Sequence, residues 1–346
     1  MSAPRVTVLM PVYNGERDLR EALESILRQT FTRFEFLIIN DGSTDSSVEI
    51  IQSYADTRIR LVHNDRNLGL VDSLNRGLEL SRGEFVARMD ADDISRVERL
   101  ERQVRFMDEN PRIGVCGSWV RVFSESGARV WKLPASSEAI RCEQFLGVGV
   151  AHPTVMMRRQ LFADHLLAYD PGYRHIEDYE LWVRALRFMD FGNIQEVLLD
   201  YRTGPAQIST LHRAEQLAAV APLRVQRVRE LGIEPTPAEQ ELHEMILNGK
   251  VPPDRVFLDR AEQWLLKLEA ANKAAAGYHA GFFSRLLFNV WFSTCVSVES
   301  TCSLRRCLGS PLFSGAHVST WQQLRGVGAW VLQKRFRETV RGPKHV

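Results

Sequence analysis

The feature that most constrains this chain is a regular alternation of short apolar runs with helical patterns, from residue 6 to residue 109. The apolar runs have the length of buried strands, and the stretches between them repeat apolar residues at helical spacing. The predicted strands cover residues 6–10, 34–39, 59–62 and 84–89, and the predicted helices cover residues 19–27, 71–80 and 97–109. This alternation predicts an α/β fold with a mainly parallel sheet flanked by helices. Ligands of such sheets bind beyond the carboxyl ends of the strands.

The pattern changes further along the chain. Residues 113–201 mix strand-like runs at 115–123 and 197–201 with a helical turn that begins near Glu177. After Gly204 the pattern is helical, and Thr236, Pro237 and Glu239 form the signature of a capped helix start. We therefore predict an α/β domain over residues 1–205 and an α-helical C-terminal region over residues 206–346.

Composition narrows the class of protein. The 346 residues are 45% hydrophobic and 25% charged, as in ordinary globular proteins. Lys and Arg total 44 against 43 for Asp and Glu, so no global field favours nucleic acid. The five cysteines form no CxxC pair, which predicts reduced thiols rather than disulfides or a zinc site.

The amino terminus and the most apolar stretch bear on localisation. Residues 1–8 lack the signature of a signal peptide, so a cytoplasmic protein is expected. Arg285 and Asn289 interrupt the apolar residues 281–298, which favours a buried helix over a membrane span. Peripheral contact with the inner face of a membrane stays open as an alternative.

Three carboxylates follow the predicted strand 84–89, at Asp90, Asp92 and Asp93. Their mutual repulsion calls for a compensating charge, and Mg²⁺ or Mn²⁺ prefers carboxylate oxygens together with substrate phosphates. The cluster therefore indicates a site for a metal and a diphosphate. The alternative is a solvated loop whose aspartates cap the following helix.

Two other polar clusters follow predicted strands. In residues 40–45, an acidic acceptor can bind the imide N–H of uracil or thymine, while Gly42 lets the chain turn close to a ligand. In residues 11–15, Tyr13 can stack beside the base. Both segments are equally consistent with ordinary turns and N-caps. Residues 67–69 and 75–77 are weaker signals of the same kind.

Together, these motifs resemble family 2 glycosyltransferases of the GT-A fold, a Rossmann-like fold of nucleotide-diphospho-sugar transferases. The resemblance covers about residues 5–205 and rests on the order of residues 10–14, 40–45, 67–69, 81–85 and 90–93. It implies an inverting transferase that moves a sugar from a nucleotide-diphosphate donor, of UDP type, to an acceptor hydroxyl. A glycan or lipid-linked acceptor in bacterial surface polysaccharide assembly is implied as well.

The resemblance also assigns residues. The DXD element matches Asp90, Ala91 and Asp92, with Asp92 as the first metal ligand, Asp90 as the second, and Mn²⁺ or Mg²⁺ as the metal. Asp41 reads the base, and the other donor-binding residues are Pro11, Tyr13, Asn14 and Asn67. Asn40 stands where the family commonly has a second aspartate, and its amide can still hydrogen-bond the base or ribose.

A second constellation surrounds the start of the helix near Glu177. An inverting transfer needs one base to deprotonate the acceptor, and a carboxylate at a helix start can supply it. The stretch resembles the family's Glu-Asp motif, which makes Asp178 the base and gives Glu177 an orienting role. Trp182 and His152 are expected at the acceptor side. The alternatives are an acidic first turn that complements the helix dipole, a core tryptophan and a buried, satisfied histidine.

One departure from the family and one rival class remain. The family often has a histidine after Tyr201 and Arg202, where this chain has Gly204, so the third metal ligand is open between His212, water and a weaker site. The absence of GxGxxG, GxxxxGK[ST] and HExxH argues against dehydrogenase, P-loop and zincin classes. The rival is a non-catalytic nucleotide-sugar-binding or scaffold protein of the same fold.

Overall fold

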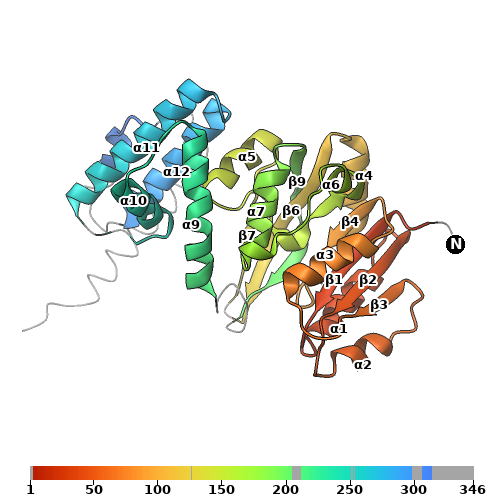
Figure 1. Cartoon of the computed structure of the whole chain (residues 1–346). Coiled ribbons are helices and arrows are strands. Elements are labelled where there is room, and N and C mark those ends of the chain that lie inside the picture. The colour runs from red at the N-terminus through yellow and green to blue at the C-terminus, as the bar shows by residue number, and fades with distance from the viewer. Residues whose placement is uncertain are drawn as a thin grey trace, which may run out of the picture. The chain divides into compact units, whose positions relative to one another are not determined.

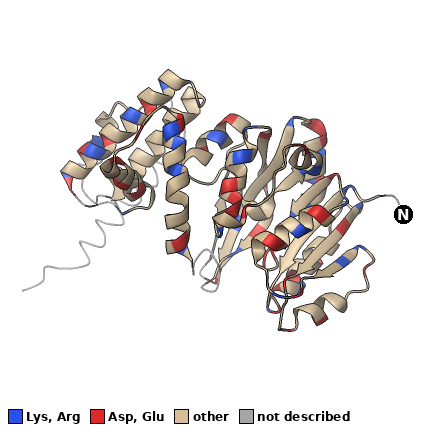
Figure 2. Cartoon of the chain, in the orientation of Figure 1, with Lys and Arg blue, Asp and Glu red and all other residues tan. Residues whose placement is uncertain are grey.

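A computed structural model describes residues 3–125, 127–204, 212–250, 252, 254–297 and 306–313. The chain divides into two compact units (Figure 1). The first comprises Met1–Pro235 and Ala276–Phe282, and the second comprises Thr236–Ala275 and Phe283–Val346. Acidic and basic side chains are interspersed along the helices of both units, as the balanced charge predicts (Figure 2).

The first four long apolar runs form the parallel part of the sheet, drawn in red to orange in Figure 1. The strands β1 (Val6–Val12), β2 (Phe34–Asn40), β3 (Ile59–His63) and β4 (Phe85–Arg88) pair in the order β3-β2-β1-β4, and all three pairings are parallel. The helices between them are α1 (Leu19–Leu27), α2 (Ser47–Gln52) and α3 (Leu70–Leu80).

Helices cover both faces of this parallel sheet. Alternate residues of β1, such as Val8 and Met10, share a core with the apolar stripe of α1. The intervening Leu9 belongs to a separate core with Val71 and Leu74 of α3. The two faces of β1 therefore pack against the apolar faces of α1 and of α3, as the residue spacing predicts. The α/β prediction is confirmed.

The rest of the sheet is mixed. It continues from β4 through β8 (Met156–Arg158), β6 (Ile113–Ser124) and β9 (Asp190–Arg202) to β5 (Ile94–Ser95), while β7 (Gly127–Trp131) pairs with β6. β8 runs antiparallel to both β4 and β6, whereas β6 and β9 are parallel. Strands as short as β5 and β8 carry too few residues for a periodic pattern, so the sequence did not predict them.

The helices of this region frame the acidic motifs. They are α4 (Arg99–Glu109), α5 (Ser137–Leu146), α6 (Arg159–Asp164) and α7 (Glu177–Ala185), with 3-10 turns at His152–Thr154 and Pro171–Tyr173. α7 is buried on two sides. Leu181 and Trp182 pack in the core beneath the sheet, while Tyr179 and Val183 contact α9 (Arg213–Glu230). This packing holds the first residues of α7 in place.

Helix α9 packs on α7, and the first compact unit extends to Pro235. The division into a catalytic domain over residues 1–205 and a helical region over residues 206–346 stays a prediction. Residues 205–211, on which the predicted boundary falls, lie outside the described part of the chain.

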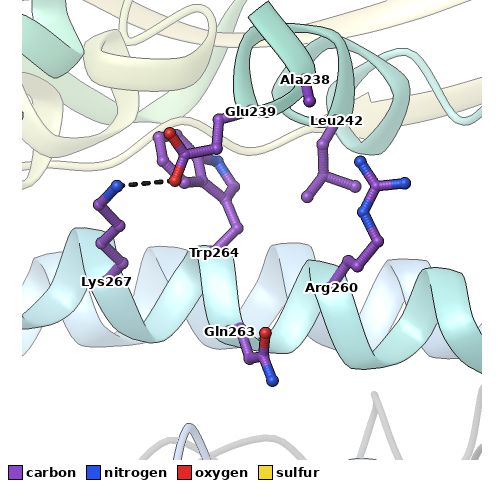
Figure 3. A pocket seen from close by; sticks show the side chains of 7 residues that line it. All are labelled: Ala238, Glu239, Leu242, Arg260, Gln263, Trp264 and Lys267. Carbon is purple, nitrogen blue, oxygen red and sulfur yellow. Dashed lines mark hydrogen bonds and ion pairs between the residues drawn. The ribbon is translucent and has the colours of Figure 1, made fainter. Parts of the chain in front are cut away.

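The second unit is helical, with α10 (Pro237–Leu247), α11 (Arg255–Ala275) and most of α12 (Ala280–Ser297). The predicted capping box is present, since Thr236 and Glu239 bond each other's backbone N–H groups. α10 and α11 line a groove in which Lys267 pairs with Glu239 at 2.6 Å beside Trp264 (Figure 3). Trp264 is buried, and its indole N–H donates to His243.

α12 contains the apolar stretch discussed above. Its Phe283, Leu287 and Trp291 are buried, as expected for a core helix. No described helix is both long and apolar enough to cross a membrane. The four cysteines within the described residues are free and buried, which agrees with the predicted reduced thiols, while Cys302 lies outside the described residues.

Candidate active site

The loops that follow β1 and β2 are joined by hydrogen bonds. The Asn14 side chain accepts from the backbone N–H of Thr44 at 2.8 Å, and the Asn14 N–H donates to the Ser43 hydroxyl at 3.1 Å. The N–H of Glu16 donates to the Asp45 carboxylate at 3.0 Å. Asn14 adopts a positive φ of 49°, a conformation that asparagine tolerates. Asn14, predicted to bind the donor, therefore also joins these loops.

Asp41 is buried at the end of β2, and its carboxylate holds the loop that precedes α3. One oxygen accepts from the Asn64 amide at 2.6 Å and from the N–H of Leu68 at 2.9 Å. The other accepts from the N–H of Gly69 at 2.9 Å. A carboxylate has about four acceptor positions, so one remains for a ligand. The structure thus gives Asp41 a structural role beside the predicted one.

Gly42 explains how these loops approach each other. Its φ is 72°, and a Cβ placed there would lie 2.7 Å from the backbone of Arg66 and Asn67. The close neighbour is therefore the loop after β3, where the sequence analysis expected a ligand. Asn67 is itself exposed at this edge.

Asn64, which was not among the predicted site residues, connects three elements. Its amide N–H₂ group also donates to the hydroxyl of Ser73 in α3, and its carbonyl accepts from Arg76. Its position directly after β3, where the other strands also end in polar residues, was the available signal.

Asp90, Asp92 and Asp93 lie together at the end of β4. Each offers a carboxylate oxygen within 4.8 Å of the others. Asp93 is fully buried; one oxygen accepts from the N–H of Arg202 at 2.9 Å, and the other has no hydrogen-bond partner among the residues that the structure describes. Burial and the charges of Asp90 and Asp92 raise the pKa of Asp93 well above its usual range. A buried, unpaired carboxylate oxygen is costly unless a cation or proton satisfies it.

The acid loop is fastened on both sides. Arg202 donates through its Nε to the carbonyl of Asp92 at 2.9 Å and pairs with Glu21 of α1 at 2.6 Å. A Cβ added to Gly15 would lie 3.7 Å from that of Ala91, so the loop after β1 borders the acid loop. The motifs at 11–15 and 90–93 therefore converge, as their shared sheet edge predicts.

Arg88 is a buried cation at the centre of this region. It forms two contacts of 2.5 Å with the carboxylate of Asp90, while its Nε has no hydrogen-bond partner among the described residues. Burial raises the pKa values of Glu177 and Asp178, and the charge of Arg88 partly offsets that rise, so Arg88 interacts with both the acid loop and the first turn of α7. The available sequence signal was an arginine inside an apolar strand, which was not among the predicted site residues.

Glu177 and Asp178 form the first turn of α7. Burial, followed by the charge of Asp178, raises the pKa of Glu177 to about 7. Burial also raises the pKa of Asp178, which is partly buried and accepts from the N–H of Tyr179 at 2.7 Å. Ile176 and Tyr179 belong to the core that faces α9, and Trp182, three positions after Tyr179, belongs to the core beneath the sheet. The two acids therefore start a helix that is packed on both sides.

His152 and Trp182 are buried in the core and are not exposed to an acceptor. Trp182 packs edge-on against His152, Phe162 and Phe191 in the core. The ring of His152 is hydrogen-bonded to the Tyr169 hydroxyl at 2.8 Å, and burial followed by the charge of Arg88 lowers its pKa well below the usual range. The placement favours the core tryptophan and the satisfied histidine over direct acceptor contact.

His212 is directed elsewhere. Its ring stacks on that of His175 at a centroid distance of 4.3 Å, and it contacts Glu215 at 3.1 Å. Among the described residues it therefore belongs to a separate cluster, and its role as a third ligand of the acid loop gains no support.

The family model described as glycosyl transferase family 2 matches residues 7–166. An uncharacterized glycosyltransferase of Haemophilus influenzae is 34% identical over 228 residues, which span 62% of this chain and 70% of that protein. The chain belongs to glycosyltransferase family 2. The protein is therefore an enzyme of the transferase class, and the rival non-catalytic class loses its basis.

Other relatives of this glycosyltransferase are informative about sequence and fold. The amylovoran biosynthesis glycosyltransferase AmsE of Erwinia amylovora is 32% identical over 214 residues, covering 59% of this chain and 78% of that protein. Staphylococcus aureus TarS, solved with UDP-GlcNAc, has a TM-score of 0.56 at 18% identity and covers 88% of this chain and 90% of that chain.

A second solved structure extends the comparison to a distant source. The mannosyltransferase PcManGT from Pyrobaculum calidifontis, solved with GDP-Man and Mn²⁺, has a TM-score of 0.51 at 17% identity, with 89% of this chain and 87% of that chain covered. At these identities the structural likeness concerns the fold, and the GT-A-like fold of this glycosyltransferase is confirmed.

Proposed function

We propose that this family 2 glycosyltransferase moves a sugar from a UDP-type donor to an acceptor hydroxyl with inversion at the anomeric carbon. One observation carries the proposal. The acid loop after β4 and the acidic first turn of α7 share one site, in which Arg88 pairs with Asp90 and its charge acts on Glu177 and Asp178.

The donor half of the proposal concerns a divalent metal. Three clustered carboxylates and the unpaired oxygen of Asp93 form an oxygen donor set that fits Mn²⁺ or Mg²⁺. Asp92 and Asp90 would hold the ion, with Asp93 beside them. When bound, it would neutralise charge on the departing diphosphate. PcManGT was solved with Mn²⁺, which supports the same assignment by analogy.

The nucleotide half of the proposal uses the neighbouring loops. Tyr13 is 50% exposed beside Pro11, so its ring is accessible for stacking on a base. Asp41 retains one acceptor position after its three hydrogen bonds, enough for the imide N–H of uracil. Asn14 and Asn67 complete the proposed donor site. TarS was solved with UDP-GlcNAc, which supports a UDP donor.

The acceptor half of the proposal concerns α7. Asp178 removes the proton of the acceptor hydroxyl as that oxygen attacks the anomeric carbon opposite the diphosphate. Burial raises the pKa of Asp178, and the positive charge of Arg88 partly offsets that rise, which favours the ionised form that this step needs. Glu177, with a pKa of about 7, holds a proton for part of the time at neutral pH and can donate a hydrogen bond that orients the acceptor.

The biological setting is a further part of the proposal. We place the enzyme in bacterial surface polysaccharide assembly, with a glycan or lipid-linked acceptor, in the cytoplasm or at the inner face of the membrane. The name of AmsE, an amylovoran biosynthesis glycosyltransferase, supports this setting.

The test is calorimetric titration of the full chain with UDP and with dTDP, each with and without Mn²⁺. Metal-dependent binding of UDP is expected, and Asp92→Ala should abolish it. Asp65→Ala is the matched control, since Asp65 is an exposed aspartate after β3. UDP-sugars are then screened for nucleotide release. Absence of nucleotide binding in the wild-type chain would contradict the proposal.

A further inference from the structure

Three metal-ligating side chains gather outside the acid loop. His175 precedes α7, while His212 and Glu215 begin α9. The Glu215 carboxylate lies 3.5 Å from Nε2 of His175 and 3.1 Å from Nδ1 of His212. One ligand atom from each residue lies within 4.8 Å of the other two. We name these three residues the histidine cluster.

We propose that the histidine cluster is a second divalent-metal site, suited to Zn²⁺ and independent of the donor site. A tetrahedral Zn²⁺ with bonds of about 2.1 Å separates its ligand atoms by about 3.4 Å. Two of the three separations, 3.1 and 3.5 Å, already match that value. Three protein ligands leave a fourth position for water.

The ligand types differ from those of the acid loop. Two imidazoles and one carboxylate favour Zn²⁺, whereas the all-carboxylate set of Asp90, Asp92 and Asp93 favours Mg²⁺ or Mn²⁺. The same chain would then hold two ions of different chemistry.

His175 is held in position before any ion binds. It adopts a positive φ of 70°, and its carbonyl accepts a hydrogen bond from the Gln216 side chain at 3.1 Å. A non-glycine residue in this conformation is uncommon and indicates a local constraint. His212 and Glu215 are more accessible, with side chains 38% and 66% exposed, so an incoming ion can reach them.

Metal binding would require one local change. The two rings now stack with an interplanar angle of 11°, and lone pairs that converge on one ion cannot remain parallel. The exposed ring of His212 can tilt, because it lies at the N-cap of α9. The ion would then link α9 to His175, two positions before Glu177, and so hold the start of α7 in place.

The test measures Zn²⁺ alone against the full chain, by competition with a chromophoric chelator. The wild type should bind one tight equivalent, and the double variant His175→Gln with His212→Gln should lose about 100-fold or more in affinity. Asp92→Ala should keep the tight equivalent, which separates this site from the donor site. His165→Gln is the matched control, because His165 is an exposed histidine outside the cluster.

Two further measurements identify the ligand types and test whether the double variant is folded. The Co²⁺-loaded wild type should give the visible spectrum of a tetrahedral nitrogen and oxygen site without a thiolate charge-transfer band. Zn²⁺ should raise the melting temperature of the wild type and leave that of the folded double variant unchanged. No tight binding, equal affinity in the double variant, or a thiolate band would each overturn the proposal.

Discussion

The loops after β1, β2 and β3 pair their polar groups with one another, whereas the region of the acid loop after β4 keeps buried polar atoms unpaired. Asp41 accepts three hydrogen bonds, and Asn14 bridges two loops. By contrast, within the part of the chain that the structure describes, one oxygen of Asp93 and the Nε of Arg88 are buried without a hydrogen-bond partner. The pKa values of Glu177 and Asp178 are raised by burial in the same site.

This difference separates a self-supporting scaffold from the proposed reactive centre. Buried polar groups are normally hydrogen-bonded, so unpaired ones mark positions that a ligand, an ion or a proton can complete. The first region holds its shape through its own hydrogen bonds, and we propose that substrate binding completes the second. Four substitutions test this contrast, two in the scaffold and two in the proposed reactive centre.

The largest expected effect is on turnover. Asp178→Asn removes the proton acceptor while keeping the shape of the side chain, so turnover should fall by about 10²–10⁴-fold. The dissociation constant of UDP should stay within about twofold. Initial rates of UDP release and calorimetry measure the two quantities. Asp164→Asn, at an exposed aspartate, is the control, and a variant with more than a tenth of wild-type turnover would remove Asp178 as the base.

The second effect is on the stability of the free enzyme. Asp41→Ala leaves the N–H groups of Leu68 and Gly69 and the Asn64 amide without an acceptor, at about 1–3 kcal/mol for each. Partial rescue by water reduces the sum, so a loss of about 3–5 kcal/mol in unfolding free energy is expected. Urea denaturation without nucleotide measures it.

The control for Asp41 is Asp65→Ala, at an exposed position after β3. Normal stability of Asp41→Ala combined with lost UDP binding would assign the carboxylate to the ligand alone. That result would break the contrast between the two regions, since both would then consist of groups reserved for substrate.

The third effect has the opposite sign. The pKa of Glu177 is about 7 in the fold and 4.5 as a free side chain. The folded state thus binds more protons between these values, and this group lowers stability as pH rises from 4.5 to 7. Glu177→Gln removes that loss and should stabilise the enzyme by up to about 3 kcal/mol above pH 7.

The gain in Glu177→Gln should shrink toward pH 4.5, because the folded wild type is then protonated at this residue and the unfolded state is already half protonated. Urea denaturation at pH 5 and pH 8 measures the difference. Glu138→Gln provides the control, since Glu138 occupies the exposed first turn of α5. A gain that is equal at the two pH values would contradict a raised pKa.

The two regions also differ in how well the sequence predicted them. The alternation of β1, α1 and β2 predicted the parallel sheet, and the carboxyl ends of those strands predicted where the motifs meet. β8 could not be predicted, because a strand of three residues is too short to show an alternating pattern. Its place in the sheet depends on antiparallel pairing with β4 and β6, which are distant in the sequence.

Side-chain roles were harder to predict than their locations. One partner of Asp41 is Asn64, which is 23 residues away along the chain, and no local pattern indicates that pairing. Arg88 was visible as a charge in an apolar strand, but its effect on Asp178 depends on the packing of α7. Motifs therefore predicted which residues converge, while burial and long-range hydrogen bonds decided which of them are structural.

The smallest expected effect concerns Tyr13, the exposed aromatic of the scaffold region. Because its ring is 50% exposed, Tyr13→Ala should change unfolding free energy by less than about 0.5 kcal/mol. Loss of stacking on the base should weaken UDP binding by about 1 kcal/mol, roughly fivefold. Phe188→Ala, at a phenylalanine that is 51% exposed and outside the predicted donor site, is the control and should leave UDP affinity unchanged. Unchanged UDP affinity in Tyr13→Ala would mean that the loop after β1 acts only as a support for its neighbours, and the scaffold region would then contact the nucleotide through Asp41 and the loop after β3.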